Sequence, residues 1–142
     1  MPTVLKTVLV QRPATTMFEL VDDVERYPEF LPWCAGATVY ERNETVTRAR
    51  IEVDYHGLAS HFTTLNRKHA PLRMDLEFVE GPFEAFKGRW TFAPLGEGGC
   101  RVEFSLDYAF SNSAMSALLG PVFAHISETL VDRFVARAEC IS

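Results

Sequence analysis

The chain has 142 residues, of which 47% are hydrophobic, and a formal net charge of −5. This length fits a single domain over residues 1–142, and the apolar content is sufficient for a buried core, which excludes a disordered chain. The acidic balance excludes a general nucleic-acid binder, so DNA is not an expected partner. No uninterrupted apolar run approaches the roughly 18 residues that a membrane-spanning helix needs.

The chain start and the cysteines indicate a cellular compartment. Residues 1–6 lack the apolar segment and the cleavage site of a signal peptide. Cys34, Cys100 and Cys140 are widely separated and lack the paired spacing of zinc ligands. We therefore expect a cytoplasmic protein with reduced thiols, no disulfide and no metal site.

The N-terminal part predicts a strand followed by two short helical segments. Residues 3–11 are rich in Val, Leu and Thr, as strands are. From Ala14 onward, apolar residues recur at the spacing of an amphipathic helix, at Met17, Leu20, Val21 and Val24. Pro28 ends that pattern. Residues 27–33 hold two prolines, which fix φ, so we expect a rigid corner there, either a second helical turn or a tight loop.

The middle of the chain alternates apolar and polar residues with the period of a β-strand. Residues 45–56 show the pattern best, with apolar or small side chains at Thr47, Ala49, Ile51, Val53 and Tyr55. Further strands are predicted at 36–42, 58–66, 72–79, 85–93 and 100–108. Together with the first strand, they predict one antiparallel sheet with one apolar face.

A helical period returns after Gly120-Pro121, a pair that suits a helix start. The apolar stripe of this helix is Phe123, Ile126, Leu130, Phe134 and Ala138. An apolar sheet face needs a cover, which this helix provides, so stripe and sheet should meet across a common interior. The predicted fold is α+β, with a curved antiparallel sheet wrapped around a long C-terminal helix and two short helices after the first strand. Strong curvature leaves a pocket between sheet and helix.

Large apolar side chains on or beside the predicted inner faces are the candidate ligand-binding residues. They are Trp33, Phe62, Phe78, Phe83, Phe86, Trp90, Phe104, Tyr108, Phe123, Ile126, Leu130 and Phe134. Such side chains line apolar cavities, but they also fill dense cores, and periodicity does not separate the two roles. We further expect the rings of residues 27–33 to close one end of the cavity.

A basic zone interrupts the acidic chain, because residues 42–73 hold six basic residues against three acidic ones. Arg48, Arg50, Arg67 and Lys68 are the candidate phosphate contacts in this zone. A solvated strand face of mixed charge is the simpler interpretation.

No catalytic motif is visible in the sequence. The four histidines lack metal-ligand spacing, and no nucleophile elbow, P-loop or dinucleotide fingerprint is present. Asp22, Asp23 and Glu25 are close in sequence, but helix neighbours point apart, which predicts an exposed helix end. We therefore expect a protein that is not an enzyme.

Residues 20–34, LVDDVERYPEFLPWC, closely resemble the signature of the coenzyme Q-binding START-domain family. Residues 81–83, 90–92 and 134–138 match further patterns of that family, so the resemblance spans essentially the whole chain. It implies the START-like helix-grip fold of the polyketide cyclase and lipid-transport superfamily, built around a hydrophobic cavity. Some members are implied to bind ubiquinone and support respiration. Similar bacterial members are implied to be ribosome association toxins, which bind the large ribosomal subunit and block subunit association.

Two main hypotheses for function follow. In the first, the protein binds ubiquinone or another isoprenoid lipid without a catalytic cofactor, and each buried CH₂ contributes about 0.8 kcal/mol. This hypothesis leaves open a transient contact with the inner membrane surface. In the second, Arg48, Arg50, Arg67 and Lys68 contact the ribosome. A cyclase-like enzyme is a third hypothesis, which the missing acid–base pair disfavours.

Overall fold

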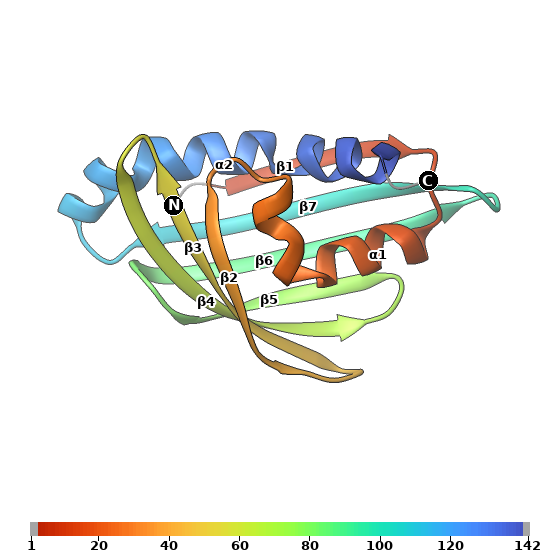
Figure 1. The fold of residues 1–142 in the computed structure, drawn as a ribbon, viewed down its shortest axis with the longest axis horizontal. Helices are drawn as coiled ribbons and strands as arrows, with labels where there is room; N and C mark the ends of the chain where they lie inside the picture. The colour runs from red at the N-terminus through yellow and green to blue at the C-terminus, as the bar shows by residue number, and fades with distance from the viewer. Residues whose placement is uncertain (1–2, 141–142) are drawn as a thin grey trace.

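The computed structural model describes residues 3–140, so the predicted domain, residues 1–142, extends past the described part at both ends. A seven-stranded antiparallel sheet, in the order β1-β7-β6-β5-β4-β3-β2, curves around helix α2 (Figure 1). The elements are β1 (Thr3–Val10), α1 (Ala14–Asp22), η1 (Val24–Glu29), β2 (Cys34–Arg42), β3 (Val46–Tyr55), β4 (Leu58–His69), β5 (Arg73–Glu80), β6 (Phe83–Leu95), β7 (Gly99–Phe110) and α2 (Ser113–Cys140). The predicted α+β architecture is confirmed.

Irregular strand pairing gives the sheet its curvature. Register shifts occur twice in β2, between Thr63 and Thr64 in β4, and between Phe83 and Ala85 in β6. An extra residue in one strand bends that strand and increases its twist. Figure 1 shows the result, with β2, β3 and β4 turned across the direction of β6 and β7. The concave face of the sheet therefore encloses a space that a flat sheet would not.

Burial alternates along β3 as the sequence predicts. Thr47, Ala49, Ile51 and Val53 are buried, whereas the intervening Arg48, Glu52 and Asp54 are exposed. Successive side chains of a strand point to opposite faces, so the first set faces the concave interior and the second faces solvent. Strand β7 repeats this alternation.

Helix α2 begins earlier than predicted, at Ser113, so that Pro121 lies within it. Asn112 caps the helix, because its Oδ1 accepts the backbone N–H of Met115 at 2.8 Å. A proline inside a helix lacks one backbone donor and clashes with the preceding turn. Buried apolar side chains on both sides of Pro121 hold the two halves in one helix despite that penalty. The glycine–proline pair was therefore a misleading start signal.

Helix α2 is also long and apolar enough in composition to cross a membrane, although charged residues interrupt its apolar positions. The sequence expectation considered uninterrupted apolar runs only and did not identify this helix. A core helix passes the same test. Val131, Phe134 and Ala138 are fully buried, and the Phe134 ring lies 5.2 Å from that of Trp90 on the sheet.

Candidate functional site

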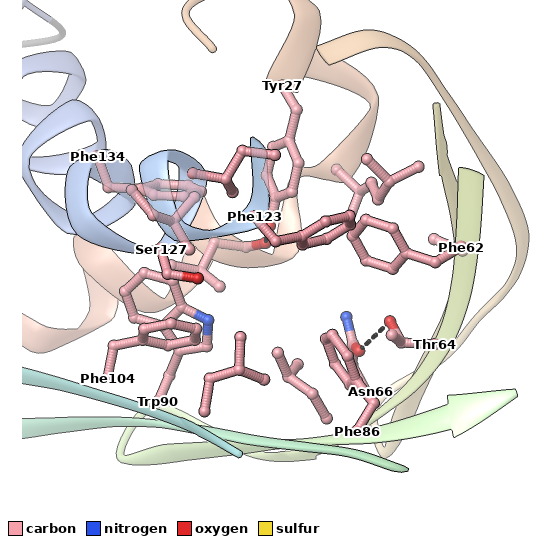
Figure 2. Close-up of a pocket in the computed structure, with 18 of the residues that line it drawn as sticks. Tyr27, Phe62, Thr64, Asn66, Phe86, Trp90, Phe104, Phe123, Ser127 and Phe134 are labelled. Carbon is pink, nitrogen blue, oxygen red and sulfur yellow. Dashed lines mark hydrogen bonds between the residues drawn. The ribbon is translucent and has the colours of Figure 1, made fainter. Parts of the chain in front are cut away.

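An apolar cavity lies between the concave face of the sheet and helix α2 (Figure 2). Its free space, counted with the part open to solvent, is about 740 Å³. Ala49 and Ile51 from β3 line it together with Phe123 and Phe134 from α2. The predicted meeting of the β3 face and the helix stripe across one interior is thus confirmed.

Most of the candidate ligand-binding residues line this cavity. They are Trp33, Phe62, Phe86, Trp90, Phe104, Phe123, Ile126, Leu130 and Phe134. They come from the η1–β2 junction, from β4, β6 and β7, and from α2, so only the folded chain brings them together.

Phe78, Phe83 and Tyr108 do not line the cavity, and the expectation for them is wrong. They belong to an aromatic cluster at one end of the interior, where Phe83 lies at the centre. Its ring centroid is 5.0 Å from those of Phe110 and Phe123, with Phe78 and Tyr108 at 5.9 and 6.0 Å. Phe123 belongs to this cluster and also lines the cavity, whereas Phe78, Phe83 and Tyr108 are not among the lining residues. Phe83 and Tyr108 belong to the buried core, and Phe78 is partly buried against it.

The corner at residues 27–33 closes part of the cavity as expected. Tyr27 and Trp33 line it, and the Tyr27 hydroxyl donates a hydrogen bond to the backbone carbonyl of Val21. Burial, which is the main cause, and the nearby Asp22 carboxylate raise the pKa of the Tyr27 phenol, so it stays a neutral donor. Phe30 instead packs against Phe134, at 5.1 Å between centroids.

Sequence reasoning missed the apolar lining residues Val21, Val24, Ala49, Ile51, Leu76 and Leu106 as binding candidates. It also missed three polar lining residues, namely Thr64 and Asn66 on β4 and Ser127 on α2. The alternation of side chains along β4 was the available signal, because Thr64 and Asn66 point to the same face of the sheet as Phe62 does. Polar residues at those inward positions could have marked a binding wall.

The polar lining residues are almost completely buried, at 6%, 5% and 1% exposure for Thr64, Asn66 and Ser127. The Thr64 hydroxyl donates to Asn66 Oδ1 at 2.8 Å, as Figure 2 shows. Within residues 3–140, Ser127 Oγ and Trp33 Nε1 are buried without a hydrogen-bond partner. The cavity wall thus combines apolar surface with a few unsatisfied neutral donors.

Charged groups are absent from the cavity lining in the described part of the chain. Among the same residues, no group of three or more His, Cys, Asp or Glu is placed to hold a metal ion. The arrangement suits burial and hydrogen bonding of an uncharged molecule.

The four candidate phosphate contacts do not share one surface. Arg48, Arg50 and Arg67 lie on the convex outer face, whereas Lys68 points inward, with a side chain only 6% exposed. The Lys68 ammonium pairs with Asp22 Oδ2 at 3.0 Å, and Asp22 Oδ1 accepts the Thr47 hydroxyl at 2.7 Å. The expectation for Lys68 is wrong because adjacent strand residues face opposite ways. The expectation of an exposed helix end is likewise wrong for Asp22, because its side chain is only 17% exposed and is engaged by Lys68 and Thr47.

Arg42, another member of the basic zone, is engaged by the short helices. Its guanidinium binds both carboxylate oxygens of Glu25, at 2.6 and 2.7 Å, and the backbone carbonyl of Asp22 at 2.7 Å. These hydrogen bonds lower the pKa of Glu25 to about 2. The contacts hold α1 and η1 against β2, beside the cavity wall that Val21 and Val24 form.

The outer face of the sheet carries mixed charge, as the simpler interpretation expects. Strand register aligns Arg48, Leu65, Glu77 and Lys87 in one row across four strands. Arg67 pairs with Glu77 within this face. In the described part of the chain, Arg48 and Lys87 form no ion pair. We call these two residues the free cations of the outer row.

Comparisons with known proteins agree with this architecture. The family model described as polyketide cyclase / dehydrase and lipid transport matches residues 10–135. The ribosome association toxin RatA of Pseudomonas aeruginosa is 37% identical over 134 residues, covering 94% of this chain and 93% of that one. RatA of Vibrio cholerae serotype O1 is 37% identical over 139 residues, covering 98% and 96%.

A more distant relative is the mitochondrial coenzyme Q-binding protein COQ10 homolog B of Xenopus laevis. It is 25% identical over 126 residues, covering 86% of this chain and 52% of that longer one. The solved structure of a START superfamily protein from Mycobacterium smegmatis has a TM-score of 0.78 at 23% identity, covering 99% of both chains. That likeness confirms the START-like fold. The chain belongs to the polyketide cyclase / dehydrase and lipid transport family.

Proposed function

We propose that this protein associates with the ribosome, in the manner that the name of its RatA relatives indicates. The observation that carries the proposal is the 37% identity to two such proteins over nearly the full length of both chains. The outer face of the sheet is the surface for this contact. Its free cations, Arg48 and Lys87, are exposed and aligned, so they can meet phosphates without first breaking an ion pair.

The test is co-sedimentation of the pure protein with bacterial ribosomes and with isolated large subunits. We expect binding that weakens as salt rises, because phosphate contacts release counterions. The double variant Arg48→Glu with Lys87→Glu should lose binding. The matched control is Arg26→Glu with Arg133→Glu, which changes the net charge equally at exposed positions of η1 and α2, away from the outer face of the sheet. Absence of sedimentation for the unaltered protein, or equal loss in both variants, would overturn the proposal.

The cavity favours a second candidate function, which is the binding of an uncharged apolar molecule that the protein does not alter chemically. Support comes from the large aromatic and aliphatic lining and from the lack of a charged group along it in the described residues. The distant relative that is named coenzyme Q-binding makes an isoprenoid quinone the first ligand to test.

The two tryptophans provide a direct measurement, because both Trp33 and Trp90 line the cavity. Addition of a short-tailed ubiquinone should quench their fluorescence in a saturable way, and mass spectrometry of the extracted ligand should show it unchanged. Linear, unsaturable quenching would contradict binding, and a new product would indicate an enzyme. The ribosome variants lie on the opposite face of the sheet and should leave quenching unchanged.

A further inference from the structure

Two residues that line the cavity carry a buried hydrogen-bond donor without a partner in the described part of the chain. Trp33 Nε1 and Ser127 Oγ are buried and unpaired within residues 3–140, and their residues are 4% and 1% exposed. Buried polar groups in proteins are normally satisfied, because an unpaired one loses its hydrogen bonds to water without replacement. An unpaired donor beside an apolar cavity is satisfied when the occupant brings an acceptor.

Asn66 adds a third donor from another wall. Its Oδ1 is occupied by the Thr64 hydroxyl, which orients the amide so that Nδ2 points into the cavity (Figure 2). In the described part of the chain, Nδ2 donates no hydrogen bond. Figure 2 places the Ser127 hydroxyl and the Asn66 amide on opposite sides of the open space. Donors on β4 and α2 therefore lie around one apolar space, which Trp33 also lines from the η1–β2 junction.

The three donors are neutral, and among residues 3–140 no cationic side chain lines the cavity beside them. Lys68 follows Asn66 on the same face of β4, but its ammonium is held by Asp22 at 3.0 Å and does not line the cavity. A carboxylate or phosphate in this space would lose its hydration without gaining a counter-charge, which is strongly unfavourable. A carbonyl or ether oxygen accepts from Trp33, Ser127 and Asn66 and needs no counter-charge.

We propose that Trp33, Asn66 and Ser127 form a head-group site that selects neutral, carbonyl-bearing lipids and rejects anionic ones such as fatty acids and phospholipids. This inference rests on the second proposed function, since it names the chemical class of molecule that the cavity accepts. An isoprenoid quinone fits the class, because its two ring carbonyls are acceptors and its tail is apolar.

The selectivity test compares three probes by equilibrium dialysis at pH 8, namely a short-tailed ubiquinone, an isoprenoid carboxylic acid and the methyl ester of that acid. Acid and ester share one chain and differ in charge. The quinone and the ester should bind, and the ester should bind roughly 10-fold or more tightly than the acid. Equal binding of acid and ester would overturn the head-group site while leaving the second function intact. No binding of any probe would overturn both.

The residue test uses Ser127→Ala and Trp33→Phe, which remove one donor each and leave most of the side-chain volume. Each should weaken quinone binding by roughly 3- to 10-fold. Ser127→Ala should leave the urea midpoint unchanged or higher, because the hydroxyl it removes is unpaired in the free protein. Ser116→Ala, at an exposed position of the same helix, is the matched control and should bind as the unaltered protein does. Full affinity in Ser127→Ala would refute a donor role for this residue, whether or not Trp33→Phe folds.

Discussion

Lys68 Nζ, on the concave face of β4, lies 3.0 Å from Oδ2 of Asp22, the last residue of α1. The two residues are 46 positions apart in the chain, and their side chains are 6% and 17% exposed. The pair joins the first helix to the sheet beside the cavity. A lysine that the sequence places in a basic surface zone is therefore a structural residue of the interior.

The first prediction concerns this ion pair. Lys68→Met should lower the free energy of unfolding by about 1–3 kcal/mol, because Asp22 would keep a largely buried charge with fewer partners. Urea denaturation followed by fluorescence measures the loss. Arg48→Met, on the exposed face of the adjacent strand, is the control and should stay within about 0.5 kcal/mol. Equal stability of the two variants would show that the buried pair contributes nothing.

The second prediction concerns the size of the cavity. Leu130 lines it from α2, so Leu130→Trp should occupy space that a ligand needs and reduce quinone binding. Overpacking should cost about 1–3 kcal/mol of stability, and the fold should persist. Leu118→Trp makes the same change at an exposed position of α2 and should preserve binding. Undiminished binding in Leu130→Trp, measured by equilibrium dialysis, would place the ligand elsewhere.

The third prediction concerns pH. Hydrogen bonds from Arg42 lower the pKa of Glu25 from 4.5 to about 2, so the unfolded chain takes up this proton at a higher pH than the folded chain. The stabilisation is therefore complete above pH 4.5 and is lost as the pH falls toward 2. Glu25 is half exposed, which limits the contribution to less than about 1 kcal/mol.

Glu25→Gln should therefore be less stable than the unaltered protein at pH 6, and the difference should shrink steadily toward pH 3. Urea midpoints across this range measure it. Glu41→Gln removes an exposed carboxylate of β2 and should show no such pH-dependent difference. A gap between Glu25→Gln and the unaltered protein that stays constant with pH would exclude the Arg42 pairing as its cause.

The fourth prediction concerns the thiols. Burial raises the pKa of Cys34 to about 11 and also raises that of Cys100, whereas Cys140 is exposed near the end of α2. The thiolate is the reactive form, so the two buried thiols are protected by inaccessibility and by protonation. An aromatic disulfide reagent at pH 8 should react quickly with one thiol and with the other two only after unfolding. Cys140→Ser should lose the fast phase, and a fast phase that survives would identify a buried thiol as accessible.

The sequence alone was enough to locate most strands and the faces that they present. Side chains of a strand alternate because of local backbone geometry, so the pattern in residues 45–56 correctly predicted which residues of β3 are buried. The same alternation along β4, followed from Phe62 through Thr64 and Asn66, places Lys68 on the concave, inner face of the sheet. That information was present in the chain, although the cluster of basic residues around Lys68 suggested an external role.

Contacts between distant segments were decided only by the tertiary structure. Whether an inward ring borders the cavity or fills the core depends on where the sheet bends and where α2 lies, so periodicity could not separate Phe86 from Phe83. The start of α2 depended on the Asn112 cap and on burial that outweighs the effect of Pro121. The meeting of Trp33, Asn66 and Ser127 at one cavity has no counterpart in local sequence, because three separate segments must pack around the same space before these residues can line it.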